Sequence, residues 1–196
     1  TQLDSTRALG TGYERPIEQG PDWFRAFVFL VPPSPPARWL GTQTPLRENP
    51  LNPPLRDAKP SVALYWDFEN LHASLSEARL GEGSYGKPDG RFKTQEPLID
   101  VQAIVDLAAS FGPIAINRAY CNWQFFGRYR DLLLQNAMEL IQLFPPGAST
   151  KNGADIRLCL DAADDIARHT HIGTVVIVSG DSDFMPLAQK IRSGGR

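Results

Sequence analysis

The chain has 196 residues, a net charge of −2 at pH 7, and ordinary fractions of hydrophobic (42%) and charged (21%) residues. This composition is typical of one globular domain, with or without a tail. The charge excludes a strongly basic protein whose overall field would attract nucleic acid, although a local basic surface is compatible with it.

The cysteines and apolar runs indicate a compartment. Cys121 and Cys159 lie far apart and in no paired metal spacing, so we expect free thiols in a reducing environment. The apolar run at residues 26–31 is too short to cross a bilayer, and it lacks the basic flank and cleavage site of a secretory signal. We therefore expect a cytoplasmic protein with no membrane partner.

Residues 1–60 form a predicted Pro-rich N-terminal leader. Eleven of the 17 prolines lie between Pro16 and Pro60. Because proline fixes φ and lacks an amide donor, this stretch cannot form a long helix or a central strand. We predict an extended, partly disordered arm. The alternative is that its apolar parts, Trp23–Phe24 and residues 26–31, dock on the following domain or on a partner.

Strands and helices alternate from residue 61 onward. Short apolar runs predict strands at residues 61–66, 114–123, 141–146 and 173–180. Helical spacing and end signals predict helices at residues 69–80, 97–112, 127–140, 153–170 and 183–195, and residues 81–90 read as a glycine-rich loop. In the fourth helix, Ile156, Leu160 and Ala163 share the expected apolar face, followed by Ile166 and Ala167.

This alternation predicts the fold class. Strand–helix–strand units build a mostly parallel sheet that is covered by helices on both faces, which is an α/β protein with three layers. Such sheets bind ligands beyond the carboxyl ends of their strands. The polar residues that follow each predicted strand are therefore the candidates for a site.

Carboxylates stand at three of these positions. Asp67 directly follows the first strand, with Asn70 at the mouth of the next helix. Asp155 lies in the first turn of a later helix, and Asp181 and Asp183 bracket the start of the last one. Each acid alone has a structural interpretation as a helix cap or as a favourable charge at a helix N-terminus. The second acid of the last pair has no such structural need.

In a parallel sheet these acids converge at one edge. Close carboxylates repel one another and take up protons unless a cation lies among them. Oxygen ligands without thiols suit Mg²⁺ or Mn²⁺ rather than zinc. A magnesium ion held by a few carboxylates and several waters is the usual arrangement for phosphate chemistry, so the pattern predicts such a site.

Other titratable residues have simpler interpretations. Asp164 and Asp165 are expected to face water, whereas Asp161 could share a helical face with Asp155. The three histidines have no partner spacing, and we expect surface or helix-end positions for His72, His169 and His171.

Three motifs together resemble a known family. They are "YWDFENL", "KNGADIRLCLDA" and "VVIVSGDSDFMPL", in this order, and they resemble the NYN domain, a branch of the PIN-like nuclease superfamily, and within it the LabA-like group. The resemblance covers residues 61–196. It implies a Rossmann-like α/β/α sandwich and a metal-dependent ribonuclease activity. By motif position, Asp67, Asp155 and Asp181 would be the core acids, supported by Asn70 and Asp183.

The resemblance also sets expectations about the ends of the chain. The family domain continues with one more strand after residue 196, so we expect the domain at residues 61–196 to be truncated before its last strand. Some related proteins carry a small winged-helix RNA-binding module after the nuclease domain. The expected protein partners are therefore a second copy in a homodimer or such a C-terminal module.

A nuclease must also hold a phosphate backbone with nearby cations. Lys151 precedes Asp155 and is the best candidate for a phosphate contact, although an ordinary loop lysine is the alternative. Arg128 and Arg130 alternate with aromatic residues in a pattern that can stack the bases of a single strand. Those aromatics are Trp123, Phe125, Phe126 and Tyr129. The alternative is that the aromatics pack a strand–helix junction while the arginines face water. A further hypothesis places Lys87, Arg91 and Lys93 in a loop that closes over RNA.

The leading hypothesis is a ribonuclease that uses Mg²⁺ or Mn²⁺ and water to hydrolyse single-stranded RNA, leaving a 5′-phosphate by family analogy. The first alternative is a regulatory RNA-binding module that keeps the acids but cuts slowly or not at all. The second is a phosphatase, in which an aspartate usually acts as a covalent nucleophile. The first motif lacks the second early aspartate that such enzymes use.

Overall fold

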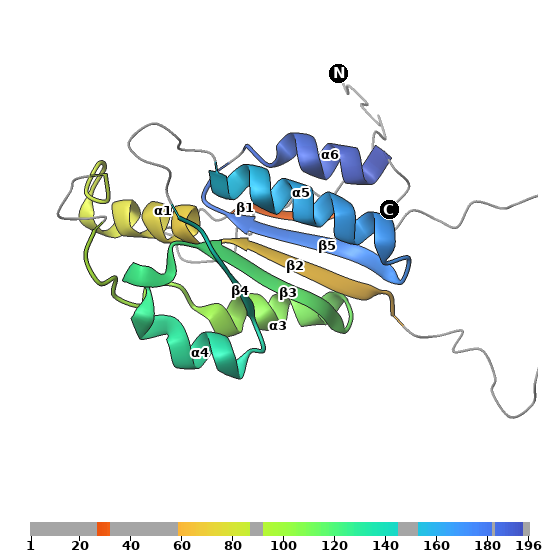
Figure 1. The fold of residues 1–196 in the computed structure, drawn as a ribbon, viewed down its shortest axis with the longest axis horizontal. Coiled ribbons are helices and arrows are strands. Elements are labelled where there is room, and N and C mark those ends of the chain that lie inside the picture. Colours follow the sequence, from red (N-terminus) through yellow and green to blue (C-terminus); the bar gives the residue numbers. More distant parts are fainter. Residues whose placement is uncertain (1–26, 32–58, 87–91, 145–152, 182, 194–196) are drawn as a thin grey trace, which may run out of the picture.

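Strand β2, Ser61–Asp67, lies in the middle of a five-stranded sheet (Figure 1). The computed structural model describes residues 27–31, 59–86, 92–144, 153–181 and 183–193. Its parallel neighbours are β3, Ile114–Cys121, on one side and β5, Ile172–Ser179, on the other. Strand β4, Glu139–Gln142, extends the parallel sheet beyond β3. The predicted mostly parallel sheet is confirmed.

Alternate side chains of β2 enter two separate hydrophobic cores. Val62, Leu64 and Trp66 face the first core. It is closed by helices α1, Phe68–Leu80, α3, Val101–Phe111, and α4, Arg130–Gln135. Since all residues of β2 from Val62 to Asp67 are buried, the strand reads as an uninterrupted apolar run, as central parallel strands do.

The second core lies on the opposite face of the sheet. Ala63 and Tyr65 of β2 point into it. It is covered by α5, Gly153–Arg168, and α6, Met185–Ser193, which lie together above the sheet in Figure 1. Helices on both faces of one sheet make the three-layer α/β/α sandwich that the sequence predicts.

A strand from the N-terminal leader forms one edge of this sheet. Strand β1, Phe27–Val31, pairs antiparallel with β5, with Phe27 opposite Ser179 and Val31 opposite Val175. Residues 27–31 of the leader thus dock on the following domain, which is the alternative to an extended, partly disordered arm. The predictions for residues 1–26 and 32–58 lie outside the described residues.

The largest difference from the predicted elements lies at residues 123–142. In place of one helix over 127–140, two short 3₁₀ turns, Trp123–Phe125 and Gly127–Tyr129, lead into α4. The helix ends early because the chain turns at Ala137, whose φ is +49°, and the amide of Met138 bonds back to the carbonyl of Leu133 at 3.1 Å. Strand β4 consequently begins before its predicted start.

The buried face of α5 is also different from the prediction. Leu158, Ala162 and Ile166 are the buried residues, whereas Ile156 and Leu160 are 59% and 63% exposed. The predicted apolar face on Ile156, Leu160 and Ala163 is therefore wrong as a core face. Two apolar faces occur on this helix, and periodicity alone does not tell which one meets the sheet.

Two further findings concern the cysteines and the length of the helices. Cys121 and Cys159 are free thiols, as predicted. Among the helices that the structure describes, none has the length and apolar character needed to cross a membrane.

Candidate active site

The carboxyl ends of β2 and β5 form a topological switch point. From β2 the chain passes to β3 on one side, whereas β5, on the other side, is reached last. Open α/β sheets bind ligands at such points. Asp67 is the last residue of β2 and Ser179 the last of β5, and the Ser179 hydroxyl donates a hydrogen bond of 2.7 Å to Asp67 Oδ2.

The Asp67 carboxylate is almost completely buried, at 1% exposure. Its Oδ2 accepts a second hydrogen bond, of 2.8 Å, from Asn70 Nδ2. Its Oδ1 is buried and has no hydrogen-bond partner in the described part of the chain. Asp67 stands at the N-cap of α1 without a side-chain capping bond, whereas Asp100 caps α3 through the amide of Ala103 at 3.0 Å. Helix capping therefore does not explain Asp67.

Burial changes the acidity of this group. Loss of hydration raises the pKa of Asp67 to about 7, the charge of Asp155 adds to the effect, and the hydrogen bonds from Ser179 and Asn70 oppose it. A buried carboxylate with one unpartnered oxygen is costly unless a positive charge accompanies it. This environment is consistent with a group that meets a cation.

Asp155, in the first turn of α5, is the second acid of the site. It is half-buried, and its Oδ1 also has no hydrogen-bond partner within the described residues. Burial raises the pKa of Asp155, and the charges of Asp181 and Asp183 raise it further. Asp155 thus lies within electrostatic reach of Asp67 at the end of β2, and of Asp181 and Asp183 in the segment after β5.

Ser179 links the two sides of this group. Its hydroxyl donates to Asp67 and accepts the backbone N–H of Asp181 at 3.1 Å. Asp181 Oδ1 in turn accepts the N–H of Asp183 at 3.2 Å. Ser179 is not among the site residues predicted from the sequence. The available signal was a polar residue that ends an otherwise apolar strand.

Gly180 lets the end of β5 approach α1 closely. A Cβ at this position would lie 2.0 Å from Ser74 Oγ and 2.5 Å from the carbonyl oxygen of Asn70. The Ser74 hydroxyl donates to the Gly180 carbonyl at 3.2 Å. Glycine is therefore required to hold Asn70 beside Asp67 and the β5 terminus.

The donor set fits a hard divalent cation in its chemistry. Carboxylate oxygens suit Mg²⁺ or Mn²⁺, and two of them, on Asp67 and Asp155, have no hydrogen-bond partner among the described residues. Within the described residues, however, no group of three or more His, Cys, Asp or Glu side chains is arranged to hold a metal. Mg²⁺ needs only one or two carboxylates because it keeps several waters, so these residues suit a hydrated ion rather than a fully enclosed one.

Of the four residues predicted to bind substrate, Asn70 contacts Asp67, and within the described part of the chain no hydrogen bond or ion pair joins the acids to Arg128 or Arg130. Arg128 is 54% exposed and forms an ion pair with Glu96. Arg130 is exposed at the start of α4. Lys151 lies outside the described residues, as do Lys87 and Arg91. Both arginines face water, which suits either a solvated surface or a contact with phosphate.

The neighbouring aromatic residues pack a junction. Phe126 and Tyr129 are buried, with ring centroids 5.7 and 4.9 Å from that of Phe68. Trp123 and Phe125 are partly buried against the same core. Phe126 and Tyr129 therefore pack the strand–helix junction, as in the alternative to base stacking, and their ring faces are not accessible to a base.

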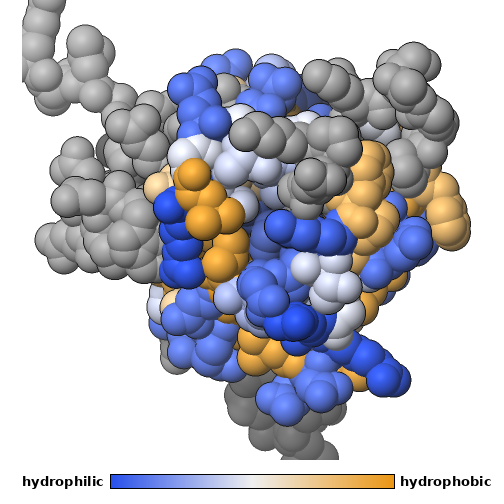
Figure 2. Space-filling model, turned by 90° about the vertical axis from the view of Figure 1, so that its left-hand side faces the viewer, coloured by the Kyte–Doolittle hydropathy of each residue, from blue (hydrophilic) through white to orange (hydrophobic). Residues whose placement is uncertain are grey.

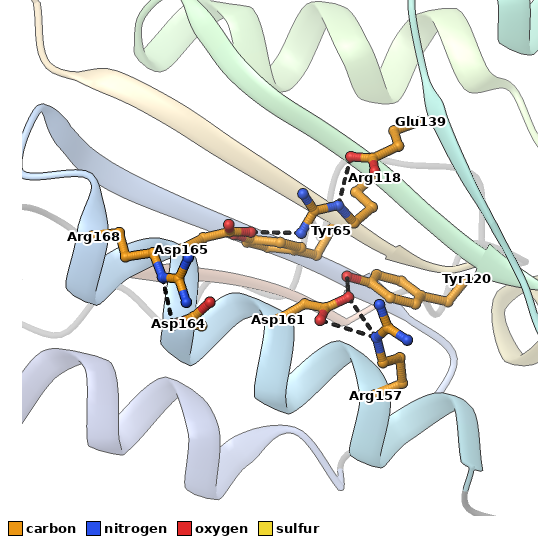
Figure 3. A network of polar contacts seen from close by, with 9 residues as sticks. All are labelled: Tyr65, Arg118, Tyr120, Glu139, Arg157, Asp161, Asp164, Asp165 and Arg168. Carbon is orange, nitrogen blue, oxygen red and sulfur yellow. Dashed lines mark hydrogen bonds and ion pairs between the residues drawn. The ribbon is translucent and has the colours of Figure 1, made fainter.

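A polar network on the α5 side of the sheet corrects one prediction (Figure 3). The Asp165 side chain is only 13% exposed, forms a 2.6 Å ion pair with Arg118, and accepts a 3.0 Å hydrogen bond from the hydroxyl of Tyr65. The expectation that Asp165 faces water is wrong because the α5 face that carries it turns toward β3. Asp164 is 55% exposed and pairs with Arg168, as expected for a solvated acid.

Asp161 belongs to the same network. It accepts a 2.9 Å hydrogen bond from the hydroxyl of Tyr120 and pairs with Arg157 at 2.9 Å. The other side of Arg118 pairs with Glu139 of β4 at 2.7 Å. These contacts connect α5 to β2, β3 and β4. The partners of Asp161 are Tyr120 and Arg157 rather than Asp155.

His72 is buried, so its predicted surface position is wrong. The side chain is 1% exposed, and Nε2 lies 3.0 Å from the carbonyl oxygen of Glu96. Its ring packs edge-on against Phe126, at a centroid distance of 5.1 Å. Burial lowers the pKa of His72, which favours a neutral imidazole that holds the segment before α3.

Figure 2 looks onto the side of the molecule toward which β2 and β5 run in Figure 1. Hydrophilic residues occupy the middle of this face between separate hydrophobic patches. A polar surface at the carboxyl ends of the strands suits a charged, hydrated ligand better than an apolar one.

The sheet order and the acids at its carboxyl edge define a PIN-like α/β domain. Residues 61–196 match the family model of the NYN domain, and the chain belongs to this family. NYN domains are nuclease-like, and their substrate class is nucleic acid. Neither the curated proteins nor the solved structures compared with the chain gave a match.

Proposed function

We propose that this protein is a metal-dependent ribonuclease that hydrolyses phosphodiester bonds of single-stranded RNA, with water as the nucleophile. The observation that carries the proposal is the buried Asp67 carboxylate at the switch point, within electrostatic reach of Asp155, with one oxygen of each acid left without a hydrogen-bond partner among the described residues. Membership of a nuclease-like family supports the same chemistry. Placement in the LabA-like group and a cytoplasmic location belong to the proposal as well.

In this proposal Asp67 and Asp155 hold the ion through their unpartnered oxygens, and Asp181 and Asp183 act on its water shell. A bound Mg²⁺ or Mn²⁺ would lower the pKa of a water molecule and compensate the negative charge at the phosphate. Asn70 and Ser179 orient Asp67 by donating to Oδ2, which leaves Oδ1 for the ion. Lys151, Arg128 and Arg130 are the proposed contacts to the RNA backbone.

The decisive experiment compares two acid substitutions of equal chemistry. Asp181→Asn changes the proposed site, whereas Asp164→Asn changes an exposed acid on α5 that pairs with Arg168. We expect wild-type protein and Asp164→Asn to cleave a single-stranded RNA in the presence of Mg²⁺ or Mn²⁺. Asp181→Asn should lose at least about 100-fold in rate, since it removes a carboxylate that acts on the water shell of the ion. Cleavage that persists in Asp181→Asn or in excess chelator would show that the site is wrongly assigned.

A regulatory RNA-binding module is the second candidate. The observation that favours it is the lack of a three-ligand metal group among the described residues. Under this alternative, the wild type shifts single-stranded RNA in a gel without metal-dependent turnover. Asp181→Asn would then bind RNA at least as tightly as the wild type, because it removes a negative charge near the phosphates.

A further inference from the structure

Helix α5 carries an apolar stripe that no other described part of the chain covers. Ile156 and Leu160 are 59% and 63% exposed, and Ala163 and Ala167 are exposed as well. The four residues recur at helical spacing, so they form one row along the helix. The row is distinct from the buried face of the same helix, Leu158, Ala162 and Ile166. Exposed apolar rows of this kind mark interaction surfaces.

The order of residue sizes along the stripe indicates its partner. Large side chains, Ile156 and Leu160, occupy the N-terminal half, and small ones, Ala163 and Ala167, occupy the C-terminal half. If two α5 helices pack antiparallel about a twofold axis between positions 160 and 163, Leu160 of each copy meets Ala163 of the other. Ile156 then meets Ala167. At every contact a large side chain meets a small one, and this is the complementarity that close helix packing requires.

The charges beside the stripe have the same symmetry. Arg157 and Asp164 lie on one flank of the row with exposed side chains, and each also pairs within its own helix, Arg157 with Asp161 and Asp164 with Arg168. In the antiparallel arrangement the same flank of each copy faces its counterpart, so Arg157 of one copy lies near Asp164 of the other. A twofold axis repeats this attraction, which gives two ion pairs that fix the register.

We propose that the outward face of α5 is a homodimer interface, with Ile156, Leu160, Ala163 and Ala167 from two copies packed antiparallel. The proposal does not depend on the ribonuclease assignment. A single helix pair lies at the small end of specific interfaces, so the dimer has a dissociation constant of about 1 μM or weaker. Cores of this kind depend most on their largest apolar residue, which is Leu160 here.

Sedimentation analysis of the full chain over a concentration series tests the proposal. Wild-type protein is expected to shift from monomer to dimer between micromolar and hundreds of micromolar. Leu160→Glu should weaken the dimer at least about tenfold, because a buried leucine is replaced by a charge. The substitution is on an exposed position, so circular dichroism should show unchanged folding. A monomer at all concentrations, or equal dimerisation of Leu160→Glu, overturns the proposal.

A mixing experiment tests the register. Arg157→Glu alone and Asp164→Arg alone each place like charges opposite one another twice, and each variant should dimerise several-fold more weakly than the wild type. An equimolar mixture restores attraction at both ion pairs, so native mass spectrometry should find mainly the heterodimer. Random pairing in the mixture overturns the antiparallel register.

Another segment of the same chain is the competing occupant of this face. A photo-crosslinking benzoylphenylalanine at position 160 distinguishes the two, with isotope-labelled and unlabelled chains mixed. Crosslinks from position 160 to α5 of a differently labelled chain support the proposal. Crosslinks to residues 1–58 of the same chain overturn it.

Discussion

At the residue scale, the chemistry of the site depends on one buried carboxyl group. Asp67 has two hydrogen-bond donors on Oδ2, from Asn70 and Ser179, and none on Oδ1 within the described residues. The desolvation that raises the pKa of Asp67 to about 7 is therefore only partly offset inside the protein. Divalent metal binding, which requires the ionised form, would supply the rest.

Asp67 should make the stability of the metal-free protein fall with rising pH. The folded state holds a proton on Asp67 up to a pKa of about 7, against an ordinary value of 3.8. Between these values the folded state binds more protons than the unfolded state, so the free energy of unfolding decreases as pH rises from 4 to 7. The loss is up to about 4 kcal/mol, and it remains lost at higher pH.

Asp67→Asn tests this dependence, because the amide carries no charge at any pH. In chelator, we expect the variant to be more stable than the wild type at pH 8 by about 1–3 kcal/mol, and to lose this advantage at pH 4. Urea unfolding at both pH values measures the difference, with Asp164→Asn as the exposed control. Adding Mg²⁺ should stabilise the wild type and not Asp67→Asn. The same stability difference at both pH values would contradict the buried-charge account.

Ser179 is a positioning residue whose loss should appear in the pH profile. Ser179→Ala removes a donor to ionised Asp67, so it should raise the pKa of Asp67 further and move the rising limb of the proposed ribonuclease activity upward by about 1 pH unit. Activity at pH 7 should fall about fivefold and recover at higher pH. Ser179→Thr should preserve the profile, and Ser193→Ala, on an exposed serine of α6, serves as the control. A uniform loss at every pH would indicate only a structural role.

At the element scale, α5 is held to the sheet by polar contacts as well as by its apolar face. Asp165 of α5 binds Arg118 of β3 and Tyr65 of β2, and Asp161 binds Tyr120 (Figure 3). Burial raises the pKa of both tyrosines, so they remain neutral donors at ordinary pH. This network fixes the rotation of α5 about its axis. It thereby decides which of its two apolar faces meets the core.

Two arginine substitutions should separate the buried from the exposed part of this network. Arg118→Met leaves Asp165 partly buried without its ion-pair partner, and we expect a loss of about 2–3 kcal/mol in the free energy of unfolding. Arg168→Met removes the exposed pair with Asp164, and the loss should be below about 0.5 kcal/mol. The arginine side chains are 17% and 71% exposed, respectively. Equal losses in urea unfolding would show that the network does not hold the helix.

At the scale of the whole molecule, the N-terminal leader and the domain share one sheet. Strand β1 pairs along the length of β5 from Val175 to Ser179. Without β1, the run "VVIVS" would form an unpaired edge with strong β propensity and no charge. The leader therefore protects the strand that carries Ser179 toward the site.

Removal of residues 1–58 should expose this edge and cause association. In a Leu160→Glu background, which is expected to weaken the proposed pairing through α5, we expect the shortened chain to form larger species at concentrations where the full chain is monomeric. Light scattering measures the size, and hydrogen exchange should show faster exchange in β5. A shortened chain that remains monomeric, with unchanged exchange in β5, would show that β1 does not protect the edge.

The sequence alone determined the layered fold and the positions of its acids. Apolar runs such as residues 61–66 and 173–180 have the length of buried strands, and the helices between them require a parallel sheet. That order alone places Asp67 and Asp181 at one edge. These features depend on local spacing and on general rules of connection, which a single sequence contains.

Only the tertiary structure decided which partner each side chain meets. Ser179 became part of the site because β5 lies beside β2, and His72 and Asp165 became buried because distant segments pack over them. Likewise, α5 has two apolar faces, and the sheet buries the one through Leu158 rather than the one through Leu160. Burial depends on contacts between distant segments. The periodicity of the sequence is therefore compatible with burial of either apolar face of α5, and only the three-dimensional packing determines which one is buried.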